Sequence, residues 1–132
     1  MNTQNPEFPN TDENDRGFVI ALDRARALLD GEGGMSFAVV AGREQPPMTA
    51  MLYAPKGFDD QKPHDRDEIY VIVSGHGMFE YDGRSAPFKT GDIIYVAAHT
   101  VHKFAGFSDD FCTWVFFYGD KVPRKGGIRT AE

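Results

Sequence analysis

The sequence contains a single cysteine, Cys112, so the chain cannot form an internal disulfide. Cys112 lies within an apolar run and is expected to be a small buried side chain rather than a nucleophile. No uninterrupted apolar stretch is long enough to span a bilayer, and the N-terminus lacks the basic and apolar regions of a secretory signal. We therefore expect a cytoplasmic protein that has no membrane partner.

Basic charge is also scarce, since the formal net charge is −6. Nucleic acids and acidic membrane surfaces need a basic footprint, which this sequence does not provide. Small molecules and other proteins remain as partners. The content of 41% hydrophobic and 26% charged residues is that of a globular chain, and 132 residues suffice for one domain.

We expect three parts in this chain. Residues 1–15 are polar and acidic and predict a flexible N-terminal arm. Residues 16–120 form the folded domain, and residues 121–132 form a basic, glycine-rich C-terminal tail, with fraying expected from Gly119 onward.

The folded part combines one helical pattern with many short apolar runs. Phe18, Leu22, Ala25 and Leu29 recur at helical spacing and predict a short amphipathic helix. Gly42 to Pro47 are expected to connect the first two strands. Short apolar runs separated by turn residues predict strands at 35–41, 48–54, 68–74, 78–81, 85–88, 93–96, 102–107 and 111–118. This order predicts an all-β sandwich or barrel.

His64 and Glu68 lie at the entrance to the third of these runs. Successive side chains on a strand point to opposite faces, so these two residues, four apart, share one face if the strand is regular. The same spacing would also suit a helix, but the β-branched Ile69 and Val71 and the following Gly75 argue against one. A histidine and a carboxylate on one face predict a metal site.

Two motifs in this chain resemble the paired motifs of the cupin superfamily. The first family motif is histidine-x-histidine, three or four residues, glutamate, six residues and glycine, and His64, Glu68 and Gly75 follow its spacing. The second is glycine, five residues, proline-x-glycine, two residues and histidine, and Gly91 and His102 follow that spacing. Over residues 55–118 the chain is similar to small single-domain conserved-barrel cupins.

The resemblance implies an all-β double-stranded β-helix of the jelly-roll kind. It also implies a divalent metal in the mouth of the barrel, held by His64, Glu68 and His102. Two imidazoles and one carboxylate suit Fe, Mn, Ni, Zn or Cu better than Ca. Such a centre leaves positions for water, substrate or dioxygen.

The chain departs from the family motifs at two positions near this site. Lys62 stands where the family has its first histidine, and we place it in the loop before the strand with its ammonium in water. The alternatives are that Lys62 anchors a substrate, that the metal is weak or absent, or that Gln61 turns inward and supplies a carbonyl oxygen. His99 stands where the family has glycine, and it is either an exposed loop side chain or a fourth ligand.

A substrate pocket is expected beside the metal. Arg66 lies between the two presumed ligands, where it would pair with Glu68 or bind an anionic substrate. Tyr70 continues the same strand face, and Phe104 shares the face of His102. Met51 or Tyr53 from an early strand would complete a largely apolar wall.

Two functions are compatible with this pattern. The first is a metal-binding cupin that acts on a small organic molecule by Lewis-acid or dioxygen chemistry, such as a dioxygenase or an isomerase. The second is a non-catalytic cupin that binds a sugar or metabolite without a functional metal. The aromatic C-terminal strand, apolar on both faces, also predicts a homodimer.

Overall fold

The structure, a computed structural model, describes residues 17–29 and 36–123, so the arm expected over 1–15 lies outside the described part. Within these residues, one helix precedes eight strands. The helix is α1 (Leu22–Leu29), and the strands are β1 (Phe37–Glu44), β2 (Pro47–Tyr53), β3 (Asp67–Ser74), β4 (His76–Tyr81), β5 (Arg84–Lys89), β6 (Ile93–Val96), β7 (His102–Ala105) and β8 (Cys112–Tyr118). No helix in the described part has the length and apolar character needed to cross a membrane. The prediction of an all-β fold with one short N-terminal helix is confirmed.

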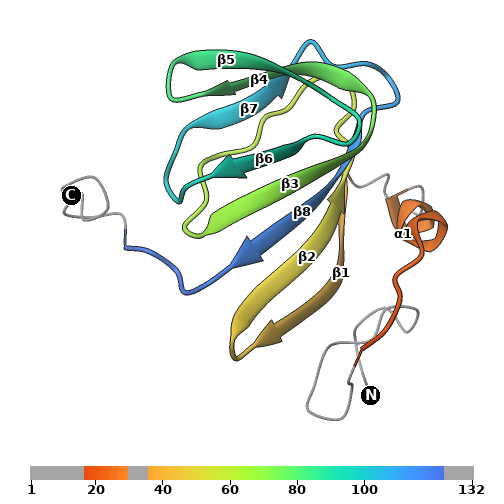
Figure 1. Ribbon diagram of the computed structural model, residues 1–132, viewed down its shortest axis with the longest axis vertical. Coiled ribbons are helices and arrows are strands. Elements are labelled where there is room, and N and C mark those ends of the chain that lie inside the picture. Colours follow the sequence, from red (N-terminus) through yellow and green to blue (C-terminus); the bar gives the residue numbers. More distant parts are fainter. Residues whose placement is uncertain (1–16, 30–35, 124–132) are drawn as a thin grey trace.

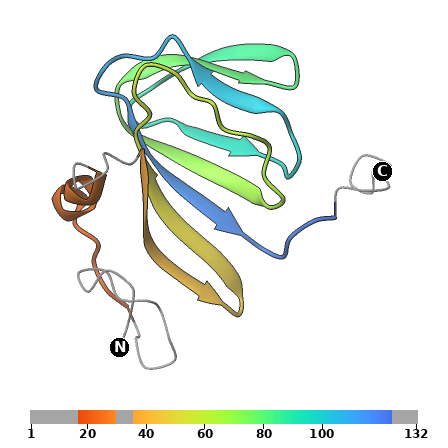
Figure 2. The ribbon, with the colours of Figure 1, turned by 180° about the vertical axis from the view of Figure 1, so that it is seen from behind.

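The strands form two antiparallel sheets that face each other (Figure 1). The larger sheet has the order β1-β2-β8-β3-β6, and the smaller has the order β5-β4-β7. Strands distant in sequence are therefore neighbours, since β8 lies between β2 and β3. Seen from behind, the segment between β2 and β3 passes across the open end of the sandwich (Figure 2).

The core between the sheets is built largely from aromatic rings. Alternate side chains of β3 turn inward, so Tyr70 and Ile72 are buried while their neighbours are partly exposed. The Phe104 ring of β7 lies 4.9 Å from Tyr70 and 4.7 Å from Phe111, measured between ring centroids. These edge and tilted contacts are the geometry that aromatic rings prefer. The inner core therefore forms a rigid floor beneath the mouth of the barrel.

Helix α1 packs on the outside of the larger sheet. Its buried Ala25 and Leu29 belong to one apolar cluster with Val40 of β1 and Leu52 of β2, and the partly buried Trp114 and Phe116 of β8 pack against this cluster. The apolar face of α1 thus covers this part of the sheet (Figure 1), and Phe18, which was expected in the helix, precedes it and packs against the same cluster. This packing explains why the outer face of β8 is apolar as well as the face that points into the core.

The strand boundaries differ from the expected ones at several ends, and two of these differences have a clear structural reason. The proposed connection from Gly42 to Pro47 is wrong, because Gly42 and Arg43 continue to pair with β2 and only a two-residue turn, Gln45 and Pro46, separates the strands. Strand β7 ends at Ala105 rather than at 107, and the next residue, Gly106, has a φ of +56° that takes the backbone out of the extended region.

Two of the predicted turn and motif glycines have clear structural reasons. The hairpin between β4 and β5 turns at Asp82 and Gly83, whose φ angles of +48° and +80° are those of the tight turn expected from this pair. Gly75 ends β3 with a φ of +93°, and a Cβ there would come within 2.6 Å of the Phe111 Cα. Glycine at the end of the first motif is therefore required by both conformation and space.

Candidate metal centre

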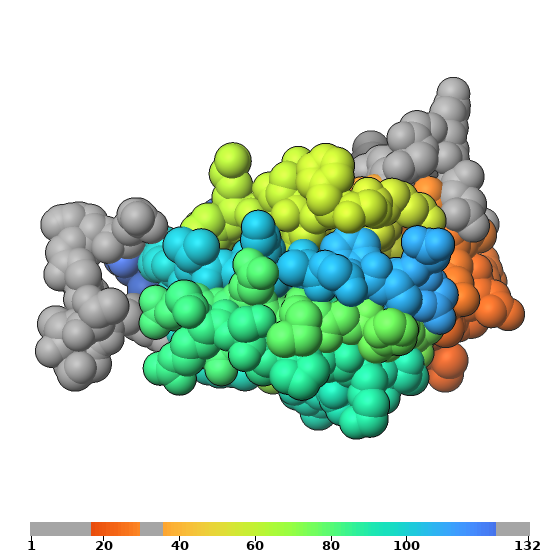
Figure 3. Space-filling view, turned by 90° about the horizontal axis from the view of Figure 1, so that it is seen from above, coloured from red at the N-terminus to blue at the C-terminus, as the bar shows by residue number. Residues whose placement is uncertain are grey.

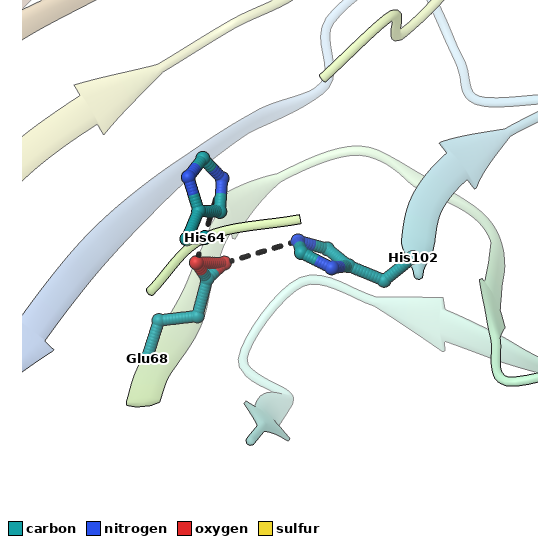
Figure 4. Close-up of side chains that lie close together, drawn as sticks. All are labelled: His64, Glu68 and His102. Carbon is teal, nitrogen blue, oxygen red and sulfur yellow. Dashed lines mark ion pairs between the residues drawn. The ribbon is translucent and has the colours of Figure 1, made fainter. Parts of the chain in front are cut away.

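Three side chains converge at the mouth of the barrel, as Figure 4 shows. The His102 Nε2 lies 3.2 Å from Glu68 Oε2, and the His64 Nε2 lies 3.7 Å from Glu68 Oε1. The three potential ligand atoms all lie within 4.8 Å of one another. Glu68 and His102 are buried, and the His64 side chain is 34% exposed toward the cavity opening. The structure therefore brings together the three residues that the sequence motifs predicted.

The three residues come from different elements, and backbone contacts hold them in place. Glu68 is the second residue of β3 and points inward with Tyr70. His64 lies in the loop before β3, because the strand begins only at Asp67, so strand alternation does not orient it as expected. Instead, the His99 N–H donates to the His64 carbonyl at 2.7 Å. This bond joins the loops of the two sequence motifs.

The Glu68 carboxylate has no hydrogen bond to compensate its burial. Glu68 is 1% exposed, and within the described part of the chain neither of its carboxylate oxygens accepts a hydrogen bond of normal geometry. The His102 Nδ1–H donates to the Thr100 carbonyl at 2.7 Å, so the neutral imidazole carries its lone pair on Nε2, toward Glu68. Ligating histidines are commonly fixed in this way. The donor set therefore fits a divalent transition metal.

The environment shifts the pKa values of three groups around the centre. Burial lowers the pKa of His64 below its ordinary value, although the charge of Glu68 opposes the shift. Burial also acts to lower the pKa of His102, but the contacts with Glu68 and the Thr100 carbonyl outweigh it and leave that pKa raised. Burial and then the Glu68 charge raise the pKa of Tyr70, so its hydroxyl stays protonated. The space between His102 and Glu68 thus favours a positive charge, either a proton or a metal ion.

A cavity of about 540 Å³ opens beside this cluster. Its wall is mainly apolar, as the sequence predicts for a small-molecule pocket. The lining residues include Met51, Tyr53, His64, Arg66, Tyr70 and Phe117. Volume and lining are those expected of a binding site for a small organic molecule.

Arg66 and Tyr70, two of the predicted pocket residues, lie in this cavity wall. Arg66 forms no ion pair with Glu68 or with any other described residue, and its Cζ lies 5.3 Å from the centroid of the Phe117 ring. The Tyr70 hydroxyl lies 3.2 Å from His102 Nε2. Of these two groups, the Arg66 guanidinium is available to a molecule in the cavity, because the Tyr70 hydroxyl donates to Gln61 Oε1 at 3.2 Å.

The structure places Phe104 and His99 away from the cavity. The Phe104 ring belongs to the buried core beneath the site, where it contacts Tyr70. The His99 imidazole is not part of the cluster, because its Nε2–H donates to the Val122 carbonyl. The φ of His99 is +65°, a conformation that glycine adopts readily, which explains the family preference at this position. The first residues of the predicted tail are accordingly held as far as Val122, and residues 124–132 lie outside the described part.

Sequence reasoning missed Asp59 and gave little weight to Gln61. Asp59 is only 7% exposed although it lies in the loop between β2 and β3. It accepts hydrogen bonds from the Tyr53 hydroxyl, from Gln61 and from the Phe104 N–H. Asp59 and Asp60 form a polar pair that reads as an exposed loop, and no local signal shows that one of them turns inward. Lys62, by contrast, is exposed in the loop, where the sequence placed it.

Comparison with known proteins agrees with this geometry. A model of the cupin domain family matches residues 50–118. The chain belongs to the cupin family. This cupin is 37% identical over 98 residues to uncharacterized protein SCO3923 of Streptomyces coelicolor, a match that covers 73% of this chain and 88% of that protein. The solved structure of KdgF from Halomonas sp. has the same fold, with a TM-score of 0.55 and 22% identity over 64% of this cupin and 78% of that chain.

Two further relatives have names that describe a function. The cupin is 39% identical over 54 residues to acireductone dioxygenase of Bacillus licheniformis. This match covers 37% of this chain and 30% of that enzyme. It is 28% identical over 94 residues to an oxalate-binding protein of Thermotoga maritima, which covers 67% of this chain and 78% of that protein. The match to the dioxygenase thus spans less than a third of that enzyme's length.

Proposed function

We propose that this protein is a metal-binding cupin that acts on a small organic molecule, with dioxygenase or isomerase chemistry. The observation that carries this proposal is the buried Glu68 carboxylate, which accepts no hydrogen bond of normal geometry from the described residues and faces two imidazole nitrogens beside a cavity of about 540 Å³. A buried carboxylate that faces neutral imidazoles is costly, and a bound cation removes that cost. The acireductone dioxygenase relative supports the class of chemistry.

The residues of the cavity wall have separate parts in this proposal. A divalent metal would supply a Lewis acid, or a position at which water or dioxygen is activated. Arg66, which has no carboxylate partner among the described residues, would bind an anionic group of the substrate. Tyr70, whose hydroxyl stays protonated and donates to Gln61 Oε1, would hold that side chain in place in the cavity wall. Apolar side chains such as Met51 would exclude water.

Metal content tests the proposal directly. We expect protein purified without chelators to contain about one equivalent of Fe, Mn, Ni, Zn or Cu per chain, measured by plasma mass spectrometry. His102→Ala should lower this content at least about tenfold, because it removes a ligand whose orientation is fixed by the Thr100 carbonyl.

His76→Ala is the matched control, since His76 is exposed at the start of β4 and outside the cluster. It should retain the metal. Wild-type protein that remains metal-free after incubation with each of these ions, while keeping its fold, would remove the basis of the proposal.

The second candidate is a non-catalytic cupin that binds a small molecule without a functional metal. Lys62 favours it, because an exposed lysine stands where the family has a histidine ligand. The oxalate-binding relative supports it as well. Metal-free protein that binds a small organic anion in calorimetry, with Arg66→Ala abolishing the binding, would establish this function instead.

We also propose that the protein is a homodimer, formed through an apolar surface on the larger sheet. This surface consists of Ile69 and Val71 of β3 with their partners Tyr95 and Ile93 of β6. Ile93 is 69% exposed and Tyr95 is 55% exposed, whereas α1 covers the opposite part of the same sheet. An apolar area of this kind is typical of an interface.

The cytoplasmic location expected from the sequence stays a prediction.

Ile93→Glu should convert the dimer to a monomer in light scattering coupled to size exclusion, because it buries an unpaired charge in the interface. Val101→Glu is the control. Val101 is 70% exposed but lies before β7, outside this surface. A monomeric wild type, or an Ile93→Glu variant that remains dimeric, would contradict the proposed interface.

A further inference from the structure

Gln61 lies in the loop between β2 and β3, and its side chain reaches the predicted metal cluster. Its Oε1 is 3.1 Å from His64 Nε2 and 3.2 Å from His102 Nε2. It therefore contacts both imidazoles, which come from separate segments of the chain. The neighbouring Lys62, which occupies the family's ligand position, is exposed.

Asp59 determines which end of the Gln61 amide faces the cluster. The Gln61 Nε2 donates to Asp59 Oδ2 at 2.7 Å, and the Gln61 backbone N–H donates to Asp59 Oδ1 at 3.2 Å. A carboxylate only accepts, so the amide nitrogen must face Asp59 and the carbonyl oxygen must face the imidazoles. Asp59 itself is held by the Phe104 N–H at 2.9 Å and by the Tyr53 hydroxyl. The orientation of the Gln61 oxygen is thus anchored in the core.

The Gln61 oxygen has a lone pair left for a cation. An amide oxygen has two lone pairs, and the Tyr70 hydroxyl, at 3.2 Å, donates to one of them. The His102 Nδ1–H is used by the Thr100 carbonyl, so a neutral His102 has no hydrogen to offer Gln61. Two acceptor atoms 3.2 Å apart repel each other unless a positive charge lies between them. With a neutral His102, the contact is therefore that of two ligands of one ion.

The spacing of the four side chains also fits a coordination shell. Metal–ligand bonds of about 2.1 Å place adjacent ligand atoms about 3.0 Å apart in an octahedron and about 3.4 Å apart in a tetrahedron. Gln61 Oε1 is 3.1 and 3.2 Å from the two imidazole nitrogens, and the Glu68 oxygens are 3.2 and 3.7 Å from them. These four separations lie close to this range, and the ligand atoms of His64, Glu68 and His102 all lie within 4.8 Å of one another, as expected of side chains grouped around one ion.

We propose that Gln61 is the fourth protein ligand of this centre, bound through its side-chain oxygen, and that Asp59 is its positioning residue. This inference rests on the proposed metal site. The resulting set has two imidazole nitrogens, one carboxylate and one amide oxygen. Its higher oxygen content favours ions such as Mn(II) and Fe(II) over softer ions, and an octahedral ion keeps two positions free for substrate.

The test compares Co(II) binding by wild-type protein, Gln61→Met and Lys62→Met. Methionine retains the length of the side chain but removes the carbonyl oxygen. Gln61→Met should weaken Co(II) binding by about 10- to 100-fold and change the visible Co(II) spectrum, which reports coordination number and ligand type. Lys62→Met should leave affinity and spectrum unchanged. The spectrum decides the question even if Gln61→Met lowers the unfolding temperature, because it depends on the ligands of the ion.

Gln61→Met with wild-type affinity and spectrum would overturn the inference but leave the metal site intact, since Gln61 would then only accept a hydrogen bond from His64. A changed spectrum in Lys62→Met instead would make Lys62 the ligand and also overturn it. Wild-type protein that binds no Co(II) would refute the metal site and the fourth ligand together.

Discussion

Replacing Glu68 with glutamine is expected to abolish metal binding and, at the same time, to stabilise the metal-free protein. The carboxylate is 1% exposed and accepts no hydrogen bond of normal geometry within the described residues. Glutamine removes the buried charge, and its NH₂ group can donate to His102 Nε2, which lies 3.2 Å from Glu68 Oε2. A group needed to bind the ion thus lowers the stability of the empty fold.

Above the pKa of His102, we expect the free energy of unfolding of the metal-free variant to rise by about 1–3 kcal/mol, since that is the typical cost of an unsatisfied buried polar group. The pH matters because a protonated His102 would pair with Glu68 and oppose the gain. Metal affinity should fall more than about 100-fold, since a charged ligand has a larger effect than the groups that only orient ligands. Urea unfolding in chelator and metal titration measure the two effects.

Glu80→Gln is the matched control, since Glu80 is half exposed and its oxygen lies 3.9 Å from Lys103 Nζ, far from any ligand role. This substitution should change neither the free energy of unfolding nor the metal affinity appreciably. A metal-free Glu68→Gln variant less stable than wild type at this pH would show that the carboxylate has partners other than a metal ion.

Asp59→Ala is expected to destabilise the protein by about 3 kcal/mol, because hydrogen bonds to a charged acceptor each contribute about 1.5–3 kcal/mol and several are lost together. The Phe104 N–H, which is buried, loses its acceptor, and the Tyr53 hydroxyl and the Gln61 amide lose theirs. The loop between β2 and β3 is then no longer fastened to β7. Figure 3 shows this loop, in yellow, lying beside the blue atoms that include β7.

Chemical denaturation measures this loss, and the Co(II) affinity should fall with it because Gln61 is no longer oriented. Asp60→Ala serves as the control, as Asp60 is the adjacent carboxylate and is exposed. Its effect on the free energy of unfolding should stay within about 0.5 kcal/mol. Equal effects of the two substitutions would mean that the Asp59 contacts do not fasten the loop.

The two buried carboxylates near the cavity have opposite effects on the stability of the metal-free fold. Among the described residues, the buried Glu68 carboxylate accepts no hydrogen bond of normal geometry and faces two imidazoles, whereas the buried Asp59 carboxylate accepts hydrogen bonds from three residues. The first is suited to bind a cation, and the second to hold the loop that brings Gln61 and His64 to it. Burial of a carboxylate therefore does not by itself indicate its role. The contacts of each carboxylate show whether it stabilises the fold or is suited to bind a cation.

The fold was predictable because its signals are local. Apolar runs bounded by turn residues mark every strand, and the Asp82-Gly83 pair marks a hairpin whose φ angles match it. Gly75 lies where the end of β3 passes close to Phe111, so the glycine of the first motif is required by a contact within the barrel. Boundaries were less certain, as Gly42 and Arg43 show, because pairing with β2 decides whether a residue of weak propensity extends a strand.

The sequence by itself determined the all-β architecture and the spacing of the two cupin motifs, and the resemblance that these motifs carry implied that His64, Glu68 and His102 would converge. Only the tertiary structure decided that His99 bonds to Val122, that Asp59 is buried, and that the Gln61 oxygen faces the imidazoles. These side chains lie in loops, where no periodic pattern sets their direction. Their orientation follows from hydrogen bonds to distant residues, and those partners are known only once the chain has folded.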